Sequence, residues 1–174
     1  MVRWKLENAP DGKALPDDRT PVEAIAGVLA ALRAVVDDLR PPALTGLSLG
    51  EAIAGHARVL AWSRGVELDL DLEASETIPE WAVRDVYRIA QEATANALRH
   101  AGAHRIAIRL VTRENDPVLE VADDGVGFAI ASTPLGSGLQ GMRERAAALG
   151  GDLEITSAVG SGTTVRLVLR LPPS

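Results

Sequence analysis

The stretch from Pro79 to Ala101, PEWAVRDVYRIAQEATANALRHA, predicts the longest helix of the chain. Proline suits the first helical position, because its missing N–H would have no partner there. Glu92 and Asn96 are four residues apart, so their side chains project in the same direction, one turn above the other. The apolar stripe of the helix recurs every three or four residues and consists of Val83, Val86, Tyr87, Ala90, Ala93, Ala97 and Leu98.

Strand patterns lie on both sides of this helix. Residues 66–72 alternate between apolar and acidic side chains, which predicts a strand with one buried face. Hairpins are predicted over residues 104–123 and 152–171, with a short helix over residues 139–149 between them. We therefore expect an α+β fold, a two-layer α/β sandwich in which a mixed, mainly antiparallel sheet carries helices on one face.

The N-terminal part of the chain predicts helices and no catalytic group. Capping boxes at Thr20–Glu23 and Ser48–Glu51 each open a helix; Pro41 stops the first, and Gly65 closes the second. The expected organisation is a poorly ordered lead-in at residues 1–19, a helical arm at residues 20–64 that includes the first helix of the main domain, and that domain at residues 65–174.

Composition excludes several classes of function. The chain has 174 residues, of which 47% are apolar, and a net charge of −6, which argues against nucleic acid as a partner. It has no cysteine and three scattered histidines, so a transition-metal centre is not expected. No apolar run approaches the roughly 20 residues that span a bilayer. We expect a cytoplasmic protein, either free or as the cytoplasmic part of a membrane-bound protein.

Polar groups of the long helix predict a phosphate and magnesium site. An amide oxygen at Asn96 and a carboxylate at Glu92 are oxygen ligands of the kind that Mg²⁺ shares with substrate phosphates. Arg99 and His100 add donors close by. For the Glu92 and Asn96 pair taken alone, a solvated polar face is the more common explanation.

Three glycine-rich segments complete the candidate site. Asp123 ends an apolar strand before Gly125 and Gly127; its carboxylate can accept a hydrogen bond from the amine of adenine, and the glycines let a flat base approach. A loop from Gly136 to Gly141 precedes a helix, where free N–H groups favour phosphate. The segment from Gly160 to Thr164 is also explained as an ordinary hairpin turn. The order of these segments indicates ATP more strongly than any one of them.

In this order the motifs resemble the ATP-binding domain of the GHKL (Bergerat-fold) superfamily, shared by histidine kinases, gyrase, the Hsp90 chaperones and MutL. The resemblance covers about residues 66–172: residues 91–100 resemble the N box, and three glycine boxes follow. Residues 138–145, GLQGMRER, and residues 38–44, DLRPPAL, are similar to sensor histidine kinases paired with LuxR/NarL-like response regulators.

The resemblance implies a role for each candidate residue. Glu92 would be the catalytic residue, either as a base or as a group that orients the metal, and Mg²⁺ would bind at Asn96. ATP would be held by Asn96, Arg99, His100, Asp123, Gly125, Gly127, Gly136, Gly138, Leu139, Gly141 and Thr163. The implied partners are a histidine-bearing dimerisation domain and, through it, a response regulator, with a homodimer in the full-length kinase.

The sequence departs from that subgroup at the phosphate acceptor. Its acceptor histidine is typically followed by Asp, but His56 here is followed by Ala57, and His100 and His104 lie within or after the N box. We therefore expect transfer of the γ-phosphoryl group to a histidine outside this chain. A serine kinase of the anti-sigma-factor type and a non-catalytic nucleotide-binding module remain as alternatives.

Overall fold

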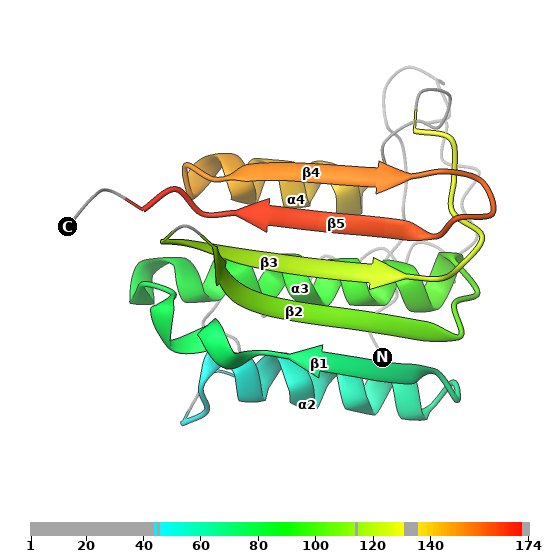
Figure 1. The fold of residues 1–174 in the computed structure, drawn as a ribbon, viewed down its shortest axis with the longest axis horizontal. Coiled ribbons are helices and arrows are strands. Elements are labelled where there is room, and N and C mark those ends of the chain that lie inside the picture. The colour runs from blue at the N-terminus through cyan, green and yellow to red at the C-terminus, as the bar shows by residue number, and fades with distance from the viewer. Residues whose placement is uncertain (1–43, 45, 114, 131–135, 172–174) are drawn as a thin grey trace, which may run out of the picture. The chain divides into compact units, whose positions relative to one another are not determined.

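One mixed sheet organises the domain in a computed structural model that describes residues 44, 46–113, 115–130 and 136–171. Its strands are β1 (Glu67–Asp71), β2 (Arg105–Arg113), β3 (Asp116–Asp123), β4 (Asp152–Ser157) and β5 (Thr163–Val168). Their order across the sheet is β1-β2-β3-β5-β4 (Figure 1). β1 and β2 are parallel, and the other neighbouring pairs are antiparallel, so the expectation of a mixed, mainly antiparallel sheet is confirmed.

The long helices of the described residues all lie on one face of the sheet. They are α2 (Leu49–Trp62), α3 (Glu80–His100) and α4 (Ser137–Ala148), and Figure 1 shows them behind the strands. A two-layer sandwich is therefore confirmed. The helix predicted after Thr20 and the lead-in at residues 1–19 lie outside the described residues.

Two local predictions need correction, and one short element was not predicted. α4 begins at Ser137, two residues earlier than predicted, because Gly136 is its N-cap with an extended backbone. Pro79 is the N-cap of α3 and not its first helical residue. A short 3-10 helix, η2 (Glu73–Thr77), links β1 to α3 and was not predicted. Single helical turns of this kind have no periodic pattern that a sequence could display.

The core lies between the sheet and the helices. Alternate residues of β2, such as Ile106, Ile108 and Leu110, are completely buried against the helical layer. The predicted stripe of α3 faces them, with Val86, Tyr87, Ala90, Ala93, Ala97 and Leu98 buried and Val83 partly buried. Burial of this surface, at about 25 cal/mol per Å², fixes α3 across the sheet and so orients its polar face.

The caps predicted at both ends of α2 are present, and ion pairs form on the acidic face of β1. At the start of α2, the backbone N–H and hydroxyl of Ser48 donate to the Glu51 carboxylate, both at 2.8 Å, and hold its pKa below the ordinary value. The backbone of Gly65 has a φ of 66°, as expected for a left-handed cap. On β1, the acidic face is neutralised where Asp69 pairs with Arg105 at 3.1 Å and Arg109 at 3.6 Å.

None of the helices in the described ranges has the length and apolar character needed to cross a membrane.

Candidate nucleotide-binding site

A cavity of about 470 Å³ opens between α3, the ends of β3 and β5, and the N-terminus of α4. All the residues singled out in the sequence line it except Gly125 and Gly141. The predicted residues that line it are Glu92, Asn96, Arg99, His100, Asp123, Gly127, Gly136, Gly138, Leu139 and Thr163. Four segments that are far apart in the sequence therefore converge on one cavity.

The register of the sheet brings two of these segments together. Asp123 at the end of β3 is opposite Thr163 at the start of β5, and Val121 is opposite Val165. Side chains two residues apart on a strand lie on the same face. The apolar pair and the polar pair therefore form one continuous patch of the cavity wall, with α3 opposite it.

Asp123 is the half-buried acid of this wall. Burial raises the pKa of its carboxyl group, and the nearby charge of Asp124 adds to the rise. The backbone N–H groups of Gly125, at 2.9 Å from Oδ1, and of Thr163 act in the opposite direction. A half-buried carboxylate with few fixed donors is suited to accept a hydrogen bond from a ligand amine.

Asp124, next to it, has a structural role and does not line the cavity. Its Oδ1 accepts hydrogen bonds from the backbone N–H groups of His104 at 2.8 Å and Arg105 at 2.9 Å, and these bonds, that of Arg105 first, lower its pKa. It thereby connects the loop after β3 to the start of β2. Of the two adjacent acids, Asp123 is the one directed to the cavity.

The first turn of α4 forms the opposite end of the site. Gly136 is its N-cap, and no side chain caps the helix there, so the N–H groups of Ser137, Gly138 and Leu139 lack intrahelical acceptors. A Cβ added to Gly138 would overlap the Glu92 carboxylate. The glycine therefore allows α4 to approach the acidic residue of α3 closely, which fixes where the free N–H groups lie.

Gly125 and Gly141 have packing roles away from the cavity lining. A Cβ on Gly125 would collide with Ala101, and one on Gly141 would lie 2.9 Å from the Arg145 guanidinium. Gly127 lines the cavity with a φ of 57°, and a Cβ there would lie 2.7 Å from the Gly162 carbonyl oxygen. Close backbone contacts therefore explain Gly125 and Gly127, whereas the contact at Gly141 is with the end of the Arg145 side chain.

The apolar lining of the cavity and one polar residue behind it were not predicted from the sequence. Ser157 Oγ accepts a hydrogen bond from the backbone N–H of Phe128 at 2.9 Å and lies 2.9 Å from the Thr163 hydroxyl. It also donates to the Gly162 carbonyl at 3.0 Å. Val121, Phe128 and Val165 complete the apolar wall. Strand alternation would have indicated the two valines; the role of Ser157 has no local sequence signal.

Comparison with protein families identifies the fold. Residues 82–173 match the family described as histidine kinase-, DNA gyrase B-, and HSP90-like ATPase. The chain belongs to this family. The match includes every element that contributes to the cavity, so the resemblance of its motifs to the GHKL ATPases is confirmed.

Similar proteins are named as sensor kinases. The chain is 34% identical over 170 residues to sensor histidine kinase MctS of Rhizobium johnstonii, which covers 95% of this chain and 36% of that protein. It is 36% identical to the signal transduction histidine-protein kinase/phosphatase UhpB of Salmonella typhimurium, covering 83% of this chain and 29% of that one. It is 31% identical to oxygen sensor histidine kinase NreB of Staphylococcus carnosus, and the alignment covers 93% of this chain and 48% of that protein. The chain thus spans less than half the length of these relatives.

Solved structures share the fold. The blue-light activated histidine kinase of Erythrobacter litoralis superimposes with a TM-score of 0.62 at 18% identity, covering 85% of this chain and 48% of that one. Its histidine kinase domain alone gives a TM-score of 0.59 at 20% identity, and the superposition covers 71% of this chain and 61% of that domain. At this identity the likeness supports the architecture only.

Proposed function

We propose that this ATPase-family domain binds Mg-ATP and transfers its γ-phosphoryl group to a histidine outside the chain, as the catalytic domain of a two-component sensor histidine kinase. The observation that carries the proposal is the convergence on one cavity of an acid suited to adenine and a helix N-terminus suited to phosphate. The relatives that match most of the chain are named as histidine kinases, which favours this activity over a serine kinase.

Each end of the cavity has its own part in nucleotide binding. Asp123 would accept a hydrogen bond from the exocyclic amine of adenine, and Val121 and Val165 of the apolar wall would contact the base. At the other end, the free N–H groups from Ser137 to Leu139 would hold phosphate oxygens, with the positive end of the α4 dipole behind them. Arg99 and His100 line the same cavity and add further donors for phosphate.

Oxygen ligands suited to Mg²⁺ lie at the phosphate end of the cavity. Among the described residues, no three His, Asp or Glu side chains form a metal cage. Asn96 and Glu92 lie on the same face of α3, a donor set that fits a cation shared with phosphates and water. Bound there, Mg²⁺ would supply neutralisation of phosphate charge. Glu92 adjoins Gly138 at this end, where it can orient the metal's ligands or accept a proton.

The positions of the three histidines indicate where the phosphoryl-accepting histidine lies. His100 lines the nucleotide cavity, His56 is half-buried on α2, and His104 precedes β2. None of these lies on a preceding dimerisation helix, so the proposed acceptor is a histidine of a dimerisation domain, and a response regulator then receives the phosphoryl group from it. Two such chains would act as a homodimer in the full-length kinase.

Calorimetric titration tests nucleotide binding. We expect the full chain to bind Mg-ATP in preference to Mg-GTP, and Asn96→Ala to abolish the magnesium dependence without changing the melting temperature much, because a cleft residue contributes little to folding. Glu76→Ala, at an exposed position of η2, is the matched control. Equal affinity for ATP and GTP would contradict the assignment of Asp123.

Transfer is tested with γ-labelled ATP. Alone, the chain should form no acid-labile phosphohistidine. Supplied with a dimerisation domain from a similar kinase, it should label that domain slowly, because the lost tether lowers the effective concentration. Labelling of a serine instead would favour a serine kinase of the anti-sigma-factor type. Labelling of His56, His100 or His104 would contradict the proposal that the acceptor histidine lies outside this chain.

A further inference from the structure

Helices α3 and α4 make two cross-helix contacts with a common spacing. Glu92 of α3 lies against Gly138 of α4, and Asp85 of α3 lies 4.0 Å from the Arg145 guanidinium of α4. In each helix the two residues are seven apart, which is about 10 Å along the axis. The pairs run in opposite directions along the sequence, so they define one antiparallel register of α4 on α3.

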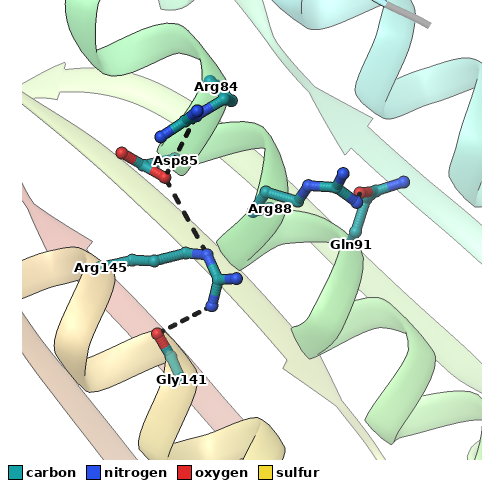
Figure 2. Close-up of polar contacts among 6 residues, drawn as sticks. All are labelled: Arg84, Asp85, Arg88, Gln91, Gly141 and Arg145. Carbon is teal, nitrogen blue, oxygen red and sulfur yellow. Dashed lines mark hydrogen bonds and ion pairs between the residues drawn. The ribbon is translucent and has the colours of Figure 1, made fainter. Parts of the chain in front are cut away.

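Arg145 is a partly exposed arginine whose guanidinium is held on two sides. Its Nη1 donates to the Gly141 carbonyl oxygen of its own helix at 3.0 Å, while Nε faces Asp85 (Figure 2). Figure 2 also shows Arg84 on the other side of Asp85, at 3.8 Å. The guanidinium therefore lies over the backbone of α4 at Gly141 and reaches across to α3.

Gly141 has no other evident reason to be glycine. Glycine inside a helix is less favourable than alanine, and Gly141 does not line the cavity. A Cβ at this position would meet Arg145 Nη1 at 2.9 Å, tighter than ordinary contact. The absence of a side chain thus leaves room for the guanidinium.

We propose that Arg145, seated on Gly141 and directed at Asp85, is a positioning residue that sets the register of α4 on α3 and so places the first turn of α4 at the phosphate end of the cavity. The inference rests on the proposed nucleotide binding. Apolar residues along α4 hold it on the core: Met142 and Ala146 are buried, Leu149 follows the helix, and Leu139 of the first turn is partly buried. Arg145 adds a polar restraint between the two helices, seven residues along α4 from the contact of Gly138 with Glu92.

The ion pair is suited to orientation more than to stability. The Arg145 and Asp85 side chains are 41% and 20% exposed, and pairs in such surroundings add little to the free energy of folding. A shift of α4 by a fraction of a turn would nevertheless move its free N–H groups away from a phosphate. Removal of the restraint should therefore weaken binding of phosphates and leave the adenine end unchanged.

The test compares ligands with and without phosphates on the full chain. Arg145→Ala is expected to bind Mg-ATP about fivefold more weakly, within the range of helix-terminus effects, with unchanged affinity for adenosine measured by competition. Glu144→Ala, an exposed neighbour on α4, is the control and should bind both ligands like the wild type.

A second variant separates positioning from folding. Gly141→Ala should maintain or raise the melting temperature, because alanine favours helix, yet weaken Mg-ATP binding by displacing the guanidinium. In the Arg145→Ala background, Gly141→Ala should have no further effect on affinity. Equal losses for ATP and adenosine, or wild-type affinity in Arg145→Ala, would overturn the proposal. Failure of the unmutated chain to bind Mg-ATP would instead refute the proposed function.

Discussion

At the scale of single residues, Asp123 has the clearest measurable property. Its pKa is raised by burial, so the free folded domain holds this proton to higher pH than the unfolded chain does. Between the ordinary and the raised pKa, the folded state binds more protons, and the contribution of Asp123 to stability declines as pH rises. A ligand amine needs the ionised form, so its binding has the opposite pH dependence.

We predict that Asp123→Asn weakens Mg-ATP binding by about 2 kcal/mol near pH 8, the value of a charged hydrogen bond. As pH falls through the raised pKa of Asp123, the wild type should lose affinity and the ratio between the two proteins should shrink. Titration of both proteins at several pH values measures this ratio, and protonation of ATP itself affects both equally. A ratio that does not change with pH would contradict the role of Asp123.

His56 is a second half-buried titratable group. Burial, and then the charge of Arg88, lower its pKa. Its Nε2 has no hydrogen-bond partner within the part of the chain that the structure describes, and its Nδ1 lies 3.4 Å from Gln91 Nε2. The folded state therefore holds His56 neutral at a pH where the unfolded chain would protonate it.

We predict that the free energy of unfolding decreases as pH falls from about 6.5, the ordinary histidine value, through the lowered pKa of folded His56. His56→Gln, which cannot become charged, should show a smaller decrease over the same interval. Urea denaturation of both proteins between pH 8 and pH 5 measures the difference. Parallel curves would show that His56 does not contribute to it.

At the scale of elements, the turn between β4 and β5 positions the cavity wall. Gly162 has a φ of 71°, and a Cβ there would overlap the backbone carbonyl of Asp123. Gly160 in the same turn has a φ of 78° with open space around it. The two glycines thus separate the cost of the backbone conformation from the cost of close packing.

We predict that Gly160→Ala lowers the free energy of unfolding by about 1 kcal/mol, the cost of a left-handed conformation. Gly162→Ala should cost more, about 2 to 4 kcal/mol, because strand β3 must also move. Denaturant unfolding gives both values, and Mg-ATP affinity should fall only in Gly162→Ala. Equal destabilisation by the two substitutions would show that the contact with Asp123 relaxes freely.

At the scale of the whole molecule, α2 is an integral part of the domain. Residues from Arg40 onward form one compact unit by themselves, and Leu49, Ile53 and Ala57 of α2 are buried in its core. We therefore propose a domain boundary near Arg40 in place of residue 65. Without α2, the helix-side surfaces of β1 and α3 would be exposed to water.

We predict that residues 40–174 fold cooperatively and bind Mg-ATP, whereas residues 65–174 do not. Each large apolar side chain removed from the core is worth about 1.5 to 3 kcal/mol, which together exceeds the margin of a small domain. Circular dichroism during thermal unfolding, with nucleotide titration, compares the two fragments. A cooperative transition in residues 65–174 would restore the boundary at residue 65.

Local patterns in the sequence determined the elements and most of the site. The apolar period of three and four residues gave α3 and the common direction of Glu92 and Asn96, and alternation gave the strands that end at Asp123 and begin at Thr163. These features depend on neighbours within a few residues, so a single sequence displays them. The order of the motifs was enough to indicate the ATPase family that the comparison confirmed.

Only the tertiary structure decided which distant groups meet. No periodic pattern in the sequence indicates that β5 lies between β3 and β4. The same is true of the contact of Gly125 with Ala101 and of the contact of Arg145 with Asp85. Glycines required by close backbone contact and glycines required by a ligand look the same in a sequence. The difference between them depends on atoms brought near by the folded chain, because contact is a property of space and not of sequence separation.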